Sequence, residues 1–128
     1  MSNREATYKL IFDAYSVEPE FPWADLPDAC VFRHYDNRKW FAIIMEVRPE
    51  VIGLKGKDKL DIINVKINPD DLYDLLQVPG ILPAYHMNKQ HWVTVLLDGS
   101  VSMKAVASLL DCSFQLTKRK IRKSGPRE

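Results

Sequence analysis

Residues 30–47 read CVFRHYDNRKWFAIIMEV, and this stretch decides the fold class. Its two apolar runs, residues 30–35 and 39–47, are separated by the turn-forming sequence Asp36-Asn37-Arg38. Two such runs joined by a short polar turn predict an antiparallel β-hairpin. Because side chains alternate along a strand, we expect the odd-numbered residues from Phe41 to Val47 on one face and the even-numbered ones on the other.

Downstream of the hairpin, residues 61–67 alternate apolar and polar side chains, which predicts a half-buried strand. Residues 91–97 predict another strand, with Val93, Val95 and Leu97 on one face. Residues 49–59 contain two glycines and are expected to form a loop between the hairpin and the first of these strands. The connection 79–90, PGILPAYHMNKQ, contains Pro and Gly, and we expect part of it to pair as an edge strand.

Three stretches predict helices. Residues 3–16 carry apolar side chains at helical spacing, with Ser2 as the N-cap and Glu5 in the position that completes a capping box. A second helix is expected to begin at Asn68-Pro69-Asp70-Asp71, where a cap, a proline and two acids follow in the order typical of helix starts. The third has an apolar stripe and is expected to run from Ser102 to about Arg122.

The loop between the first helix and the hairpin, residues 17–28, holds three prolines, which exclude a regular helix. We expect Phe21 and Trp23 to fix this loop on the core. The element order α-β-β-β-α-β-β-α predicts an α+β fold, a two-layer sandwich with an antiparallel sheet and helices packed on one face. One domain is expected over residues 1–123, followed by a short C-terminal tail over 124–128.

The composition is that of a globular chain, because 46% of the 128 residues are hydrophobic, enough for one core without a metal or a disulfide. No apolar run reaches the roughly 18–20 residues of a membrane span, and the N-terminus lacks the order of a signal peptide. We therefore expect a cytoplasmic protein, acting as a monomer. Cys30 and Cys112 are then expected as reduced thiols, and a disulfide between them stays open as an alternative.

Charge is distributed unevenly along the chain. Residues 1–30 hold two basic and six acidic side chains, whereas residues 117–128 hold six basic and one acidic. A basic end can indicate an anionic partner. The alternative is a solvated helix end whose cations complement the helix dipole.

The segment 83–99, PAYHMNKQHWVTVLLDG, resembles the signature of the MmcQ/YjbR family, in which a Pro-containing loop leads to His-x-Asn-Lys-x-His-Trp and a strand ends in Leu-Asp-Gly. Three other segments resemble the family as well: Lys39-Trp40-Phe41-Ala42, the strand Ile63-Asn64-Val65-Lys66 with Pro69 after it, and Ser113-Phe114 in place of a Ser-Tyr pair. The likeness extends from about residue 5 to about residue 122.

The resemblance implies a secretion-chaperone-like fold with the element order given above, and it implies DNA binding. No helix-turn-helix, zinc-finger or RNP signature is present, so the binding expected is weak and without sequence preference. The candidate contacts to nucleic acid are cations, donors and one stacking ring: Lys39, Lys55, Lys57, Lys66, His86, Asn88, Lys89, His91, Trp92, Lys118, Arg119, Lys120, Arg122 and Lys123.

Other readings of these residues stay open. The alternative for the polar cluster between Tyr85 and Trp92 is a loop whose side chains satisfy its own backbone. A protein-interaction module, in line with the chaperone-like fold, would use exposed Trp23, Trp40 and Tyr85 as anchors. A small-molecule or enzymatic role would need a deep pocket lined by His86, His91 and Trp92.

Neither catalysis nor a cofactor is expected. His34, His86, His91 and Cys30 do not follow the spacing of a metal site. Cys112 stands on a helix with no motif that supplies a base, so we expect a core-facing thiol there.

Overall fold

The fold is given by a computed structural model that describes residues 2–118. The described elements are α1 (Arg4–Tyr15), β1 (Cys30–Arg33), β2 (Trp40–Val47), the 3₁₀ turn η1 (Pro49–Ile52), β3 (Leu60–Lys66), η2 (Pro69–Asp71), α2 (Leu72–Leu75), β4 (Ile81–Pro83), β5 (Trp92–Leu96) and α3 (Met103–Thr117).

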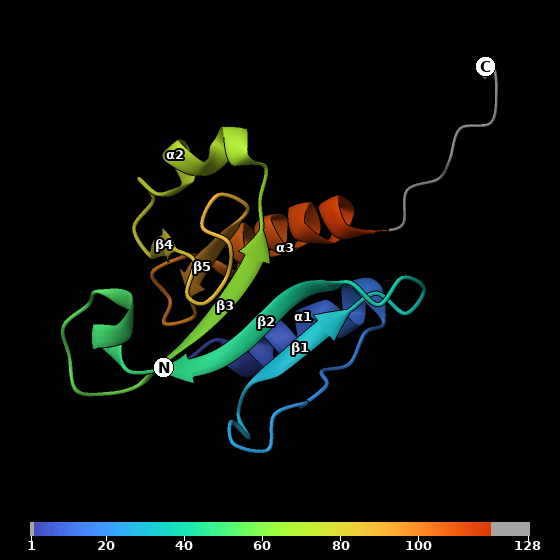
Figure 1. The fold of residues 1–128 in the computed structure, drawn as a ribbon, viewed down its shortest axis with the longest axis horizontal. Coiled ribbons are helices and arrows are strands. Elements are labelled where there is room, and N and C mark those ends of the chain that lie inside the picture. Colours follow the sequence, from blue (N-terminus) through green and yellow to red (C-terminus); the bar gives the residue numbers. More distant parts are fainter. Residues whose placement is uncertain (1, 119–128) are drawn as a thin grey trace.

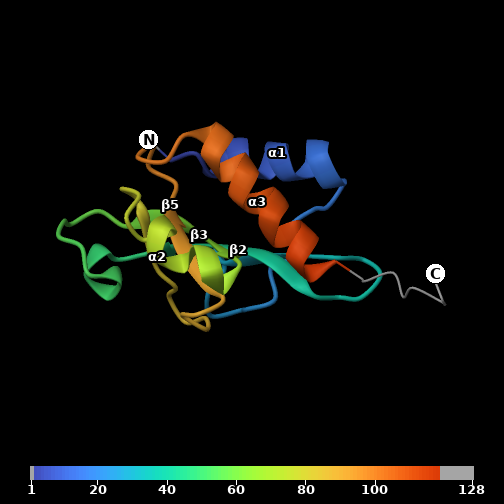
Figure 2. The same cartoon turned by 90° about the horizontal axis from the view of Figure 1, so that it is seen from above.

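The five strands form one antiparallel sheet in the order β1-β2-β3-β5-β4. Helices α1 and α3 lie side by side on one face of this sheet, while η1 and several connections lie on the other side (Figures 1 and 2). The predicted α+β sandwich is therefore confirmed, as are the hairpin β1–β2 and the short edge strand β4 within the 79–90 connection.

The main core fills the space between the sheet and the two long helices. Ile11 of α1 and Leu110 of α3 are fully buried against strand residues such as Ile44 and Ile63. Each such side chain contributes about 1.5–3 kcal/mol of hydrophobic free energy on burial. The two helices and this core cover one face of the sheet. We therefore looked for functional surfaces on the opposite face and at the ends of the sheet.

Strand β2 differs from the predicted alternation at one residue. Phe32 is opposite Ala42 and Arg33 is opposite Trp40, so Phe41 is an extra residue in the ladder, a β-bulge. The bulge lets Phe41 and Ala42 both face the helices, where the Phe41 ring packs edge-on against Phe114 with centroids 5.0 Å apart. The odd-numbered residues after the bulge do share a face, as expected, but Phe41 does not join them.

Helix α3 ends at Thr117, five residues before the predicted end at Arg122. Lys118 has an extended backbone, with φ −67° and ψ 159°. The Asn37 side chain donates to the Thr117 carbonyl at 3.0 Å and so occupies the acceptor that another helical turn would need. A residue of the β1–β2 turn thus stops a sequence that is favourable for a helix.

Two expectations near the N-terminus were wrong. The cap of α1 is Asn3, not Ser2, because the Asn3 N–H donates to the carbonyl of Leu97 at 2.7 Å and holds that residue outside the helix. Phe21 is 53% exposed and does not fix the 17–28 loop. Trp23, the other predicted anchor, does hold the loop on the sheet, with its ring edge-on to Trp40 at 5.8 Å.

The start of the second helical segment is as predicted. The Asn68 side chain accepts from the Asp70 N–H at 3.0 Å, and Pro69 occupies the first turn of η2. The regular helix α2 that follows has only four residues. Three leucines of this segment pack against the main core: Leu72, Leu75 and Leu76.

Candidate functional site

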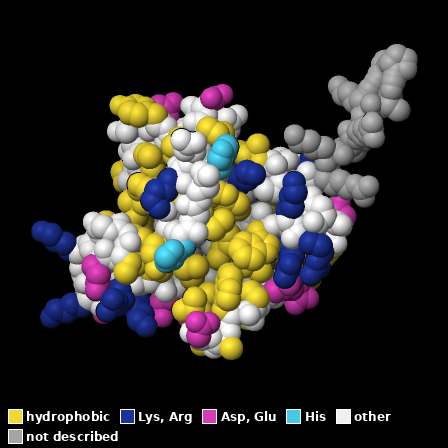
Figure 3. Space-filling view, viewed as in Figure 1, with side chains coloured by type: hydrophobic (Ala, Val, Ile, Leu, Met, Phe, Trp, Pro, Cys, Tyr) yellow, Lys and Arg dark blue, Asp and Glu magenta, His cyan; other side chains and the backbone are white. Residues whose placement is uncertain are grey.

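The sheet face turned away from α1 and α3 is only partly covered. We call it the open face; by strand alternation and register it carries Val31, Arg33, Trp40, Ile43, Met45, Val47, Leu60, Ile62, Asn64, Lys66, Leu82, Trp92, Thr94 and Leu96. Figure 3 views this face and shows hydrophobic side chains gathered at its centre, with Lys, Arg, His, Asp and Glu side chains around them.

Charges in the strands separate by sign between the two faces. The basic side chains Arg33 and Lys66 point to the open face, whereas the acidic side chains Glu46 and Asp61 stand on the helix side. Asp61 is paired there with Arg4 of α1 at 2.9 Å. The strands therefore present only positive charge on the open face.

Two tryptophans and one lysine lie together at one end of the open face. Lys66 is directly opposite Trp92 on the neighbouring strand, and Trp40 immediately precedes the bulge at the same end of the sheet. All three side chains are partly exposed. We call them the Trp–Lys surface (Trp40, Lys66 and Trp92). Partly exposed indole rings beside an ammonium group can stack on a planar ring and contact an anion at the same time.

Arg33 adds less charge to this surface than its position suggests. Its guanidinium donates to both carboxylate oxygens of Glu20, at 2.8 and 3.1 Å. Lys39, the predicted contact next to Trp40, is exposed at the start of β2. Apart from Arg33, which is opposite Trp40 and paired with Glu20, Lys66 and Lys39 are the cations next to the two indole rings along the described strands.

The Trp–Lys surface is supported from below by α3. The Ser113 hydroxyl is fully buried, donates to the Phe41 carbonyl at 2.6 Å and accepts from the Lys66 N–H at 2.8 Å. One side chain of the helix thus satisfies two backbone groups that lie just beyond Ala42–Val65, the last pair of the β2–β3 ladder. The positions of Trp40 and Lys66 depend on this contact, because each lies next to the bonded backbone.

A buried polar pair crosses the middle of the open face and holds the connection between β4 and β5. The Thr94 hydroxyl donates to the side-chain amide oxygen Oδ1 of Asn64 and accepts from the Tyr85 N–H at 2.9 Å. The Asn64 amide donates to the Tyr85 carbonyl at 3.1 Å. This network could not be predicted from the sequence, because both polar residues fit the outward positions of half-buried strands.

The predicted cluster of residues 85–92 divides into structural and free groups. Asn88 forms a turn, since its side chain accepts from the Gln90 N–H at 2.8 Å and its carbonyl accepts from Trp92 at 3.0 Å. Lys89 donates to the Ala84 carbonyl at 2.7 Å. His86 and His91 are exposed, and His86 has a left-handed backbone with φ 59°.

The remaining predicted contacts are spread over the molecule. Lys55 and Lys57 are exposed in the loop before β3, and the length of that strand places them roughly 20 Å from Lys66. Lys118 follows α3 and lines a hollow with His34 and Tyr35 at the β1–β2 turn. Arg119, Lys120, Arg122 and Lys123 lie outside the described residues.

The other groups considered from sequence do not converge. Cys30 is buried beneath α1, with its sulfur 3.7 Å from the Tyr8 hydroxyl, and burial raises the pKa of its thiol. His34 is buried against α3, with Nε2 2.9 Å from the Thr117 hydroxyl. Cys112 is half-buried on α3, and both cysteines are free thiols. Within residues 2–118 no group of three or more potential ligands is placed to hold a metal ion.

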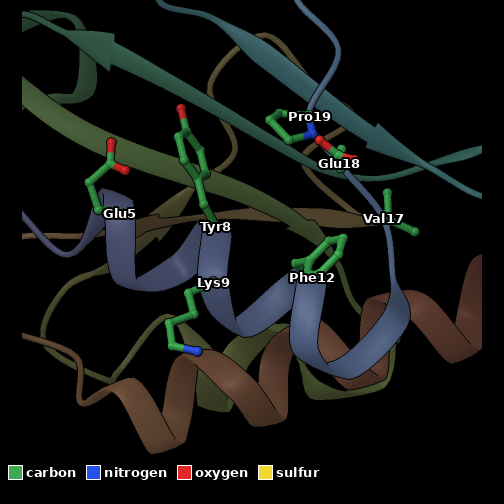
Figure 4. A pocket seen from close by; sticks show the side chains of 7 residues that line it. All are labelled: Glu5, Tyr8, Lys9, Phe12, Val17, Glu18 and Pro19. Atoms are coloured by element: carbon green, nitrogen blue, oxygen red, sulfur yellow. The ribbon is translucent and has the colours of Figure 1, made fainter.

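A hollow of about 400 Å³ lies far from this surface, between α1 and residues 17–19. Tyr8 and Phe12 project from α1 beside the segment that carries Glu18 and Pro19 (Figure 4). Burial and the contact with Cys30 raise the pKa of Tyr8 to about 12, so its hydroxyl stays neutral. Glu5 and Glu18 make the rim more acidic than basic, which does not suit an anionic ligand.

Comparison with known proteins identifies the family. The family model described as YjbR matches residues 12–116 of this chain. The chain belongs to the YjbR family. The resemblance drawn from residues 83–99 is thereby confirmed. In the part of the chain that the structure describes, no helix is long and apolar enough to cross a membrane.

Relatives of this YjbR-family chain match over most of its length. The Bacillus subtilis protein YyaQ is 37% identical over 118 residues, which cover 92% of this chain and 100% of YyaQ. Escherichia coli YjbR is 33% identical over 82 residues, or 62% of this chain and 69% of YjbR. The names of these relatives state no activity, so the function must be argued from the surface.

Solved structures show the same fold. A crystal structure from Pseudomonas syringae superposes with a TM-score of 0.89 at 45% identity, covering 91% of this chain and 99% of the other. A Deinococcus radiodurans protein superposes with a TM-score of 0.70 at 26% identity, covering 97% and 85% of the two chains.

Proposed function

We propose that this protein binds DNA weakly and without sequence preference, and that it binds a single strand through the Trp–Lys surface. The observation that carries the proposal is the register of β3 and β5, which sets the Lys66 ammonium opposite the Trp92 indole on an open sheet face. Aromatic rings that stack bases beside cations that track the backbone are the usual means of binding single strands without reading sequence.

The sign of the charges on the open face supports binding of an anion there. The strands place only basic side chains on the open face, and the acidic Asp61 and Glu46 stand on the helix side. Lys39 and Lys118 lie at the end of the sheet where Lys66 lies, so a phosphate backbone passing over Trp92 would meet further cations.

The overall charge limits the affinity. Residues 119–128 hold five of the 18 basic and one of the 17 acidic side chains, so residues 2–118 carry a net charge of −3. A body of this charge repels nucleic acid at long range and attracts it only where cations gather. We therefore expect micromolar binding at low salt, contributed by a few phosphate contacts and by stacking.

Fluorescence anisotropy with a labelled 12-nucleotide single strand and a matched duplex tests the proposal. At 50 mM salt the single strand is expected to bind in the micromolar range and more tightly than the duplex, and 200 mM salt weakens binding. No binding of either probe at 50 mM salt would remove the proposal.

A pair of charge-matched variants locates the contact. Lys66→Gln removes a cation from the Trp–Lys surface, whereas Lys104→Gln removes one from the exposed side of α3. Loss of one phosphate contact reduces the log–log salt slope by about 0.7 for a single strand, and this is expected for Lys66→Gln alone. Equal losses in both variants would point to non-specific attraction rather than to this surface.

A further inference from the structure

A second concavity opens on the open face beside the Trp–Lys surface. It has a volume of about 250 Å³ and lies between η1 and the start of the β4–β5 connection. Four apolar side chains form its walls, and a tyrosine ring and an ammonium group complete the lining: Val51, Ile52, Pro83, Ala84, Tyr85 and Lys89.

One wall of this concavity is held rigidly. The Tyr85 backbone is fixed at both ends, because its N–H donates to Thr94 at 2.9 Å and its carbonyl accepts from Asn64 at 3.1 Å. Lys89 donates to the Ala84 carbonyl at 2.7 Å, which places its ammonium at the rim and leaves two of its three N–H donors. A site whose lining is fixed before binding loses less entropy when a ligand enters.

The lining chemistry selects a class of ligand. Apolar walls with one aromatic ring suit a flat, uncharged ring, and a single cation at the rim suits an anion attached to that ring. The volume is below the roughly 300–1,000 Å³ of sites for drug-sized molecules, so one ring system fits rather than a dinucleotide. An unpaired nucleobase with its phosphate has this combination of properties.

The concavity lies near the proposed nucleic-acid surface. Tyr85 is bonded to Thr94, and Trp92 lies two residues before Thr94 on the same face of β5, a separation of roughly 7 Å. Neighbouring nucleotides of one strand can span such a distance. We propose that the concavity between η1 and Tyr85 receives one unpaired base of the strand whose neighbouring bases stack on the Trp–Lys surface. This inference rests on the proposed function.

A pair of substitutions at Val51 tests this inference on the full chain. Val51 is 41% exposed at the edge of the concavity, so both replacements leave the core intact. Val51→Phe fills the concavity and Val51→Ala enlarges it. Because one stacked base contributes about 1–3 kcal/mol, Val51→Phe is expected to weaken binding of a 12-nucleotide oligothymidylate at least about fivefold. Val51→Ala is expected to bind within twofold of the unchanged protein.

Amide NMR shifts of the unchanged protein on addition of the same oligonucleotide give an independent readout. The inference predicts shifts at Ile52 and Ala84 together with shifts at Trp92. Shifts at Trp92 alone, with full affinity in Val51→Phe, would overturn the base site and leave the proposed function standing. No shifts at either place would remove both, and would direct the search to a protein side chain as the occupant.

Discussion

Thr94 and Asn64 are the residues on which the open face most depends, because they are buried polar groups in an apolar sheet. Thr94→Val keeps the shape of the side chain but removes the hydroxyl that joins Asn64 to the Tyr85 N–H. Leaving these groups unsatisfied is expected to lower the free energy of unfolding by about 1–3 kcal/mol. Urea denaturation measures this loss of stability. Ser108→Ala, on the exposed side of α3, is the control and is expected to change the free energy of unfolding by less than about 0.5 kcal/mol.

His34 gives the molecule a defined response to acid. Burial lowers the pKa of His34 below its usual 6.5, an effect that Lys39 strengthens and Asp36 opposes. The unfolded chain then binds a proton at this histidine more readily than the folded chain does. The stabilisation that buried, neutral His34 contributes to the free energy of unfolding is therefore fully present above about pH 6.5 and is lost as the pH falls. The urea midpoint is expected to fall more between pH 7.5 and 5.0 for the unchanged protein than for His34→Gln. An equal fall of the urea midpoint in the two proteins would contradict this role of His34.

At the scale of elements, helix α3 is joined to the sheet where the β2–β3 ladder ends, next to the bulge in β2. Ser113→Ala removes the bonds to the Phe41 carbonyl and the Lys66 N–H, both next to the Trp–Lys surface. We expect a loss of about 2–3 kcal/mol in the free energy of unfolding, and weaker binding of a single strand because Trp40 and Lys66 are displaced. A variant that loses neither stability nor affinity would show that the bulge is held by the core alone.

The elements also show what a sequence can predict. Strands β3 and β5 follow simple alternation, so their faces could be assigned correctly in advance. The phase of β2 could not, since the bulge at Phe41 is set by packing against α3. The end of α3 depends on Asn37, some 80 residues away in sequence, which donates to the Thr117 carbonyl. Tertiary hydrogen bonds of this kind leave no local pattern.

The candidate site, too, could be predicted only in part. The sequence identified Lys66 and Trp92 as candidates, and the structure brings them to one end of the open face. The sequence alone could not separate Asn88, which closes a turn, from residues that are free to contact a ligand. Lys55 and Lys57 were predicted as contacts only because they are positively charged.

At the scale of the whole molecule, the three tryptophans lie on one side of the sheet. Trp40 and Trp92 are on the open face, and Trp23 contacts Trp40 with ring centroids 5.8 Å apart. These are all the tryptophans of the chain, so none lies in the helix layer. Intrinsic tryptophan emission therefore reports on the open face without any label on the protein.

The most direct test of the proposed function follows tryptophan emission while unlabelled single-stranded DNA is added at 50 mM salt. Because bases stack on Trp40 and Trp92, we expect emission to fall in step with the anisotropy of the labelled strand and to recover at 200 mM salt. An anisotropy increase without any change in emission would place the DNA elsewhere on the chain and contradict binding at the Trp–Lys surface.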